Sequence, residues 1–211
     1  MKKKVEELSP AEIASLFPTP VYRCFFSRQF SIQEKTFFDK QLQDIERNIG
    51  NTVTKSSYVL NAKPLRHIKK ELELRLQHYL NHVLNAEKDT KLYITQSWMN
   101  RTLPNEWHHE HTHPNSYVSG VLYLSADKNQ DKIFFDSHRP PAIGPAIKDN
   151  NPWNSSAYWF PVETGNLLLF PSSLPHRVHH KQGHNERISL SFNTFLKGKL
   201  GSVSTLTALK L

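Results

Sequence analysis

The sequence predicts an α+β, mainly β fold: a jelly-roll (cupin-like) barrel with N-terminal helices packed on the outer face of its major sheet. Helix signals fall within residues 1–90. From Lys91 onward, short runs rich in Val, Ile, Tyr, Phe and Thr are separated by turn residues. We see no internal repeat or linker in the 211 residues. We therefore expect one domain, with a helical support at 1–90 and a jelly-roll core at 91–211.

Capping boxes, in which a serine precedes a glutamate by three residues, mark two helix starts in the N-terminal part. The first begins at Ser9 with Pro10 in the first helical position, and the second begins at Ser31 and ends at Gly50. A third helix is predicted from Pro64 by apolar residues at helical spacing. The predicted elements are helices at 10–16, 32–49 and 64–83, a strand at 21–26 and a loop at 51–63.

The C-terminal part is predicted to consist of short strands joined by turns. The predicted strands are 91–101, 117–125, 132–136, 157–162, 166–170, 175–180 and 186–196. Residues 137–156 contain four prolines and little periodicity. A loop of this length inside a domain is typical of a lid or a binding loop, so we expect it to cover a substrate.

A group of histidines is the strongest chemical signal in the chain. Its members are His108, His109, His111, His113 and His176. Side chains two residues apart in a strand point to one side, so we expect His109, His111 and His113 to share one face and His108 and Glu110 the other. Two of these imidazoles could bind one ion together.

His176 follows the predicted strand at 166–170 and is the candidate third ligand. Three ligands on one side of an ion leave open coordination positions, which catalysis requires. Arg187, Ser189 and Ser191 alternate along the last predicted strand and share one face. A guanidinium and hydroxyls on an inward face suit a carboxylate. The sequence thus predicts a metal site beside an anion clamp.

Four segments of the chain resemble the 2-oxoglutarate and Fe(II)-dependent oxygenases, specifically a small bacterial and phage group with a histidine-rich first motif. The segments are Phe17–Val21, Ser97–Asn100, His111–Leu124 and Phe170–Asn193. The resemblance implies a double-stranded β-helix, with Fe(II) held by the first motif and His176. It implies that Arg187 and Ser189 bind the distal carboxylate of 2-oxoglutarate. Tyr123 and Asn100 are further candidates for co-substrate binding.

The first motif departs from the pattern of the wider superfamily, where a histidine pairs with an aspartate or glutamate two residues later. The alignment on Pro114 places His111 and His113 in these positions, so the three ligands would all be neutral. We rank the pair His111 and His113 first and the pair His109 and His111 second. The pair His108 and Glu110, which would restore a carboxylate, is third.

The resemblance implies a reaction of 2-oxoglutarate with O2 that yields succinate and CO2 and hydroxylates an unidentified substrate. We favour hydroxylation over halogenation because His113 fills the position that is a small residue in halogenating relatives. Two other hypotheses remain open. The chain could be a cupin-like metalloprotein whose activity needs no 2-oxoglutarate, or a metal-stabilised binding module without enzymatic activity.

Composition restricts partners and location only loosely. The net charge of +8 is compatible with an acidic small molecule or protein substrate, and nucleic acid is weakly supported because no arginine-rich stripe is interleaved with aromatic residues. The single cysteine, Cys24, fits a reducing compartment, so we expect a cytoplasmic protein. We expect no signal peptide and no membrane partner. The sequence leaves a homo-oligomer open.

Overall fold

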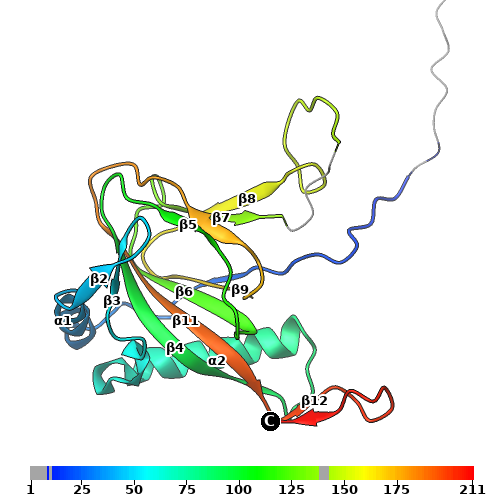
Figure 1. Ribbon diagram of the computed structural model, residues 1–211, viewed down its shortest axis with the longest axis horizontal. Helices are drawn as coiled ribbons and strands as arrows, with labels where there is room; N and C mark the ends of the chain where they lie inside the picture. The colour runs from blue at the N-terminus through cyan, green and yellow to red at the C-terminus, as the bar shows by residue number, and fades with distance from the viewer. Residues whose placement is uncertain (1–8, 10, 138–142) are drawn as a thin grey trace, which may run out of the picture.

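The computed structural model describes residues 9, 11–137 and 143–211 (Figure 1). Its N-terminal elements are β1 (Tyr22–Phe25), α1 (Ile32–Gln41), β2 (Ile45–Arg47), β3 (Thr52–Thr54), the short 3-10 helices η1 (Val59–Asn61) and η2 (Lys63–Leu65), and α2 (Arg66–His82). The remaining strands are β4 (Lys91–Thr102), β5 (His108–His111), β6 (Val118–Ser125), β7 (Lys132–Asp136), β8 (Ala157–Pro161), β9 (Asn166–Pro171), β10 (His176–Val178), β11 (Arg187–Lys197), β12 (Lys199–Leu200) and β13 (Leu209–Lys210).

Two antiparallel sheets form the body of the protein. The major sheet has the strand order β1-β9-β6-β11-β4-β3-β2, and the minor sheet has the order β5-β10-β7-β8. Strands β4 to β11 pass repeatedly between the two sheets, as a double-stranded β-helix requires. The jelly-roll prediction is therefore confirmed. Every strand predicted beyond Lys91 is present, with ends shifted by no more than a few residues.

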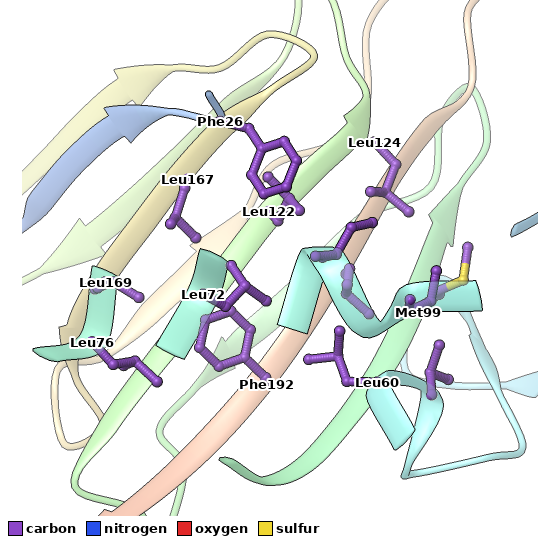
Figure 2. Close-up of a cluster of buried hydrophobic side chains, with 14 of the residues drawn as sticks. Phe26, Leu60, Leu72, Leu76, Met99, Leu122, Leu124, Leu167, Leu169 and Phe192 are labelled. Carbon is purple, nitrogen blue, oxygen red and sulfur yellow. The ribbon is translucent and has the colours of Figure 1, made fainter. Parts of the chain in front are cut away.

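The outer face of the major sheet is covered by α2, as predicted (Figure 1). Side chains of α2, including the fully buried Leu72 and Leu76, pack against apolar residues of β6, β9 and β11 (Figure 2). Phe192 of β11 lies at the centre of this core. A Cβ on its neighbour Gly120 would collide with the Phe192 ring, so the glycine makes room for it. This layer is closed and apolar.

A second apolar cluster lies between the two sheets. It combines residues of β6 and β9 with Ile133 and Phe135 of β7. The cluster fills one part of the space between the sheets, and the polar side chains described below occupy another. The space between the two sheets therefore contains an apolar part and a polar part.

Two helix predictions for the N-terminal part are wrong. Residues 11–16 form no helix, although Pro10 itself lies outside the described residues. Their side chains are exposed, so no packing stabilises a helix of this length, which is marginal in isolation. The second helix begins at Ser31 as predicted, with its capping box present, but it ends at Gln41 rather than near Ile49.

Sheet pairing explains the early end of α1. Residues 45–47 form β2, which pairs with β3, and β3 pairs with β4. The predicted loop at 51–63 therefore contains β3 and η1. Strands of three residues carry too few side chains to give a clear sequence signal, so only tertiary pairing reveals them.

The predicted lid falls partly outside the described residues, because 138–142 are not among them. Residues 143–156 contain no helix or strand, in agreement with a loop. The role of this segment as a lid stays a prediction. Within the described ranges, no helix has the length and apolar character needed to cross a lipid bilayer.

Candidate active site

A cavity of about 530 Å³, counting the part open to solvent, lies between the two sheets. It is lined by residues of β4, β5, β6, β7, β9, β10 and β11, by His113 after β5 and by Asn51 before β3. The polar and aromatic lining residues are Asn51, Trp98, Asn100, His108, His111, His113, Tyr123, His176, Arg177, Arg187, Ser189 and Ser191. The candidates His111, His113, His176, Arg187, Ser189, Tyr123 and Asn100 thus share one cavity.

Three of the histidines are close enough to hold one ion. Ligand nitrogens of His111, His113 and His176 lie within 4.8 Å of one another. His111 and His176 are direct partners across β5 and β10, and their ring centroids are 4.3 Å apart. His113 lies just after β5, held by its backbone N–H, which donates to the carbonyl of Ser172. A strand pair and a tethered loop therefore position the group.

Backbone carbonyls determine the tautomers of two of these rings. Nδ1 of His111 lies 2.8 Å from the carbonyl oxygen of His109, and Nδ1 of His176 lies 3.0 Å from that of Leu174. A carbonyl oxygen only accepts, so Nδ1 must carry the proton in both rings. Nε2 is then the free nitrogen in each ring. Such outer hydrogen bonds are typical of histidines that bind metals.

The alternation predicted along β5 is wrong. His111 pairs with His176 and His108 pairs with Val178, so two residues of β5 stand opposite one residue of β10. This β-bulge breaks the two-residue period. His108, expected on the opposite face from His111, therefore lines the same cavity, and their rings stack at 4.5 Å. His109 instead lines an adjoining outer groove.

The bulge also produces a second possible ligand group, formed by His108, His109 and His111. Nδ1 of His109 is buried and has no hydrogen-bond partner among the described residues. Glu110 belongs to neither group; its side chain is exposed and its carboxylate lies 4.0 Å from Nε of Arg177. The geometry thus contains two overlapping groups that share His111.

Burial keeps these imidazoles neutral. It lowers the pKa of His108 to about 3 and the pKa of His113 to about 4. It also lowers the pKa of His111 and places the pKa of His176 well below its usual range. Neutral imidazole is the form that binds metal ions, so the group is ready for an ion near neutral pH.

Arg187 contributes a buried and unmatched positive charge to the cavity. Its side chain is 4% exposed, and Nη2 donates to Oγ1 of Thr102 at 3.0 Å. No carboxylate in the described part of the chain lies within ion-pair distance, and burial lowers the pKa of the guanidinium. An isolated buried charge is unfavourable, so this arrangement favours an anionic ligand.

Other polar groups lie near the guanidinium. Tyr123 and Asn100 pair with Ser189 on the two flanking strands. Burial raises the pKa of Tyr123 to about 12, so the phenol stays protonated and can donate. The amide of Asn100 donates to Oγ of Ser191 at 2.9 Å, and its Oδ1 is buried without a partner in the described structure.

Asn51 was not predicted from the sequence. It lies in the segment expected to be a loop, and it reaches the cavity only because β3 pairs with β4. Its side chain is fully buried and its Nδ2 has no partner among the described residues. An asparagine after a glycine gives no sequence signal for such a position, since the same pair is common in turns.

A family model described as "Putative 2OG-Fe(II) oxygenase" matches residues 96–193. The match contains β5 with its histidines, His176 and Arg187. A search of the curated proteins finds none that matches the chain.

Three solved structures illustrate the structural similarity. An oxidoreductase of the 2OG-Fe(II) oxygenase family from Burkholderia pseudomallei is 16% identical, with 78% of this chain and 79% of that chain covered and a TM-score of 0.53. HygX from Streptomyces hygroscopicus, with nickel, 2-oxoglutarate and hygromycin B bound, is 16% identical, with 83% and 82% covered and a TM-score of 0.54. A Pseudomonas putida prolyl-4-hydroxylase is 14% identical, with 83% and 92% covered and a TM-score of 0.50. At these identities the similarity shows the fold.

Proposed function

We propose that the chain is an Fe(II)- and 2-oxoglutarate-dependent dioxygenase that hydroxylates a substrate and releases succinate and CO2, since residues 96–193 match the family model described as "Putative 2OG-Fe(II) oxygenase". One observation supports this proposal above the others. A group of neutral histidines and a buried, unmatched guanidinium line the same cavity. This is the arrangement that a metal-chelating dicarboxylate requires.

We assign the metal to His111, His113 and His176. This group joins β5 to β10 across the minor sheet, and two of its rings are oriented by backbone carbonyls. The other group, with His108 and His109, lacks His176. Three imidazoles fit Fe(II) among other first-row metals, and they leave its double positive charge uncompensated. That charge favours binding of a dianion.

The protein groups would hold 2-oxoglutarate at its far end. Arg187 binds the distal carboxylate, Ser189 adds a hydroxyl, and Tyr123 and Asn100 complete the pocket. When bound, the iron and 2-oxoglutarate supply the activation of O2 and the oxidation of the substrate C–H bond. The side chains of the chain orient the co-substrate and limit the access of water.

The substrate would approach through the outer groove, which shares His108, Arg177 and Val178 with the cavity. The other residues of the groove are Trp107, His109, Glu110, His179, His180 and Gln182. Arg177 is paired with Asp136 through two hydrogen bonds of 2.8 Å, so the groove has little excess charge. Structural relatives include a protein with bound hygromycin B and a prolyl-4-hydroxylase, which makes both small molecules and peptides candidate substrates.

The rival hypotheses explain less of the site. A cupin-like enzyme that needs no 2-oxoglutarate, or a binding module with a structural metal, gives no role to the unmatched charge of Arg187. Both hypotheses explain the group of histidines but not the buried arginine beside it. The behaviour of 2-oxoglutarate is therefore the discriminating measurement.

The test is to add 2-oxoglutarate to the protein loaded with Fe(II) without oxygen, record the visible charge-transfer band, then admit O2 and measure succinate by NMR. We expect a band and slow succinate formation even without substrate. The variant His176→Ala should give neither. If the wild type binds iron but gives no band, the 2-oxoglutarate proposal is wrong and the cupin-like hypothesis is favoured.

A further inference from the structure

We propose that Asn51 binds the co-substrate, by donating a hydrogen bond from Nδ2 to the same distal carboxylate that Arg187 holds. This inference rests on the proposed function and adds a residue to it. Asn51 lies outside the segment 96–193 that the family model matches, and the side chain belongs to the β2–β3 hairpin.

The register of three neighbouring strands places Asn51 near Arg187. Arg187 pairs with Thr102, and Thr52 pairs with Arg101, so Asn51 continues the ladder at the level of Thr102. The three residues therefore form a row across the sheet, with neighbouring strands about 4.8 Å apart. The guanidinium of Arg187 reaches its hydrogen-bond partner on Thr102, in the middle of the row. It thus extends toward Asn51.

The orientation of the Asn51 amide is fixed by one hydrogen bond. Nδ2 of Asn48 donates to Oδ1 of Asn51 at 3.0 Å, so the oxygen faces Asn48. Nδ2 of Asn51 is left as a buried donor with no partner among the described residues, although the side chain lines the cavity. A buried donor without an acceptor is destabilising, so its retention indicates that a ligand supplies the acceptor.

The chemistry of that ligand follows from its neighbours. The guanidinium of Arg187 has five N–H donors and a single hydrogen bond to the protein in the described structure. Two unmatched groups of donors, one of them charged, converge on the same part of the cavity. A carboxylate, with two oxygens and about four lone-pair sites, satisfies both at once. A neutral carbonyl would leave the charge of Arg187 uncompensated.

The experiment compares two ligands in four proteins: the wild type, two variants of Asn51 and one control variant. The affinity of the Fe(II)-loaded, oxygen-free protein is measured for 2-oxoglutarate and for 2-oxopentanoate, which chelates in the same way but lacks the distal carboxylate. The variants are Asn51→Ala and Asn51→Asp; the matched control Asn81→Ala changes an exposed asparagine of α2.

We expect Asn51→Ala to weaken 2-oxoglutarate about tenfold, the usual effect of losing one hydrogen bond to a charged group, and to leave 2-oxopentanoate unchanged. Asn51→Asp keeps the oxygen that accepts from Asn48, but it places a negative charge beside the distal carboxylate of 2-oxoglutarate. We therefore expect this variant to lose more affinity for 2-oxoglutarate than Asn51→Ala does. The control should bind both ligands as the wild type does.

Two results would overturn this inference alone: unchanged affinity for 2-oxoglutarate in Asn51→Ala, or an equal loss for both ligands, which indicates a general distortion of the cavity. If the wild type itself does not bind 2-oxoglutarate, the proposed function fails together with the inference. The failures are therefore distinguishable.

Discussion

The two faces of the major sheet use the same strands for opposite purposes. Toward α2, Leu122, Leu190 and Phe192 are fully buried in an apolar layer. Toward the minor sheet, Arg187 and Asn100 are almost as buried. In the described part of the chain, Oδ1 of Asn100 has no partner and Arg187 makes a single side-chain hydrogen bond. Because side chains alternate along β11, each residue that stabilises the fold has a neighbour directed at the cavity. The face toward α2 stabilises the fold, whereas the face toward the minor sheet keeps polar groups available for a ligand and lowers the stability of the protein.

The largest expected effect is on the apolar face. Phe192→Ala should lower the free energy of unfolding by about 3–5 kcal/mol, because it leaves a large cavity beneath α2. Chemical denaturation of the metal-free protein measures this loss. The affinity of the folded fraction for 2-oxoglutarate should change little. The matched control is Phe195→Ala on the same strand, where the ring is 37% exposed and the loss should be much smaller. Equal losses at the two positions would contradict the comparison.

For Arg187→Met we expect the opposite result, a loss of affinity for 2-oxoglutarate without a loss of stability. Loss of a buried charge partner should weaken 2-oxoglutarate by about 2–5 kcal/mol, which is at least 30-fold, as titration of the charge-transfer band would show. Stability without ligand should be unchanged or higher, because an unmatched buried charge is removed. Arg101→Met is the control, since Arg101 forms a partly exposed ion pair with Glu186. A marked loss of stability in Arg187→Met would indicate that this face also stabilises the fold.

A smaller effect is expected where the two faces meet in β6. Gly120 lines the cavity with its backbone, but an added Cβ would collide with Phe192 on the other side. Gly120→Ala should therefore destabilise the protein by about 1–3 kcal/mol through overpacking. Combining it with Phe192→Leu should recover part of that loss, as a double-mutant cycle would measure. Strictly additive losses would contradict direct contact.

The smallest expected effect is the pH dependence of the metal-free protein. The pKa values of His108 and His113 in the folded state, about 3 and about 4, lie below the usual value of 6.5. Between about pH 6.5 and pH 4 the unfolded chain therefore binds more protons, and stability must fall as pH falls. Thermal unfolding at about pH 7.5 and pH 6 measures the onset of this loss. His108→Gln should reduce the slope; an unchanged slope would exclude a contribution of His108.

Sequence patterns predicted those parts of the fold whose side chains repeat over many residues. The alternation of β11 gave the inward face of Arg187, Ser189 and Ser191, which the cavity lining confirms. The length and apolar face of α2 gave its position on the major sheet. These patterns were reliable because burial on one side is required along the whole element.

Predictions failed where tertiary packing, rather than a repeating pattern of side chains, decided the local structure. The bulge in β5 depends on pairing with β10, so the faces of His108 and His109 were not readable from their spacing. Asn51 entered the cavity through the pairing of β3 with β4. The segment at 11–16 had a helix start signal but no surface to pack against. In the first two cases the strand that decides the local structure is distant in the sequence.

The β2–β3 hairpin has a thermodynamic consequence for the site. It is made of two strands of three residues and lies at the edge of the major sheet, so few hydrogen bonds prevent it from opening locally. An open hairpin removes Asn51 from the cavity. If a ligand engages Asn51, it binds only the closed form and must shift that local equilibrium toward closure. Amide hydrogen exchange in β2 and β3 would then slow when 2-oxoglutarate is added.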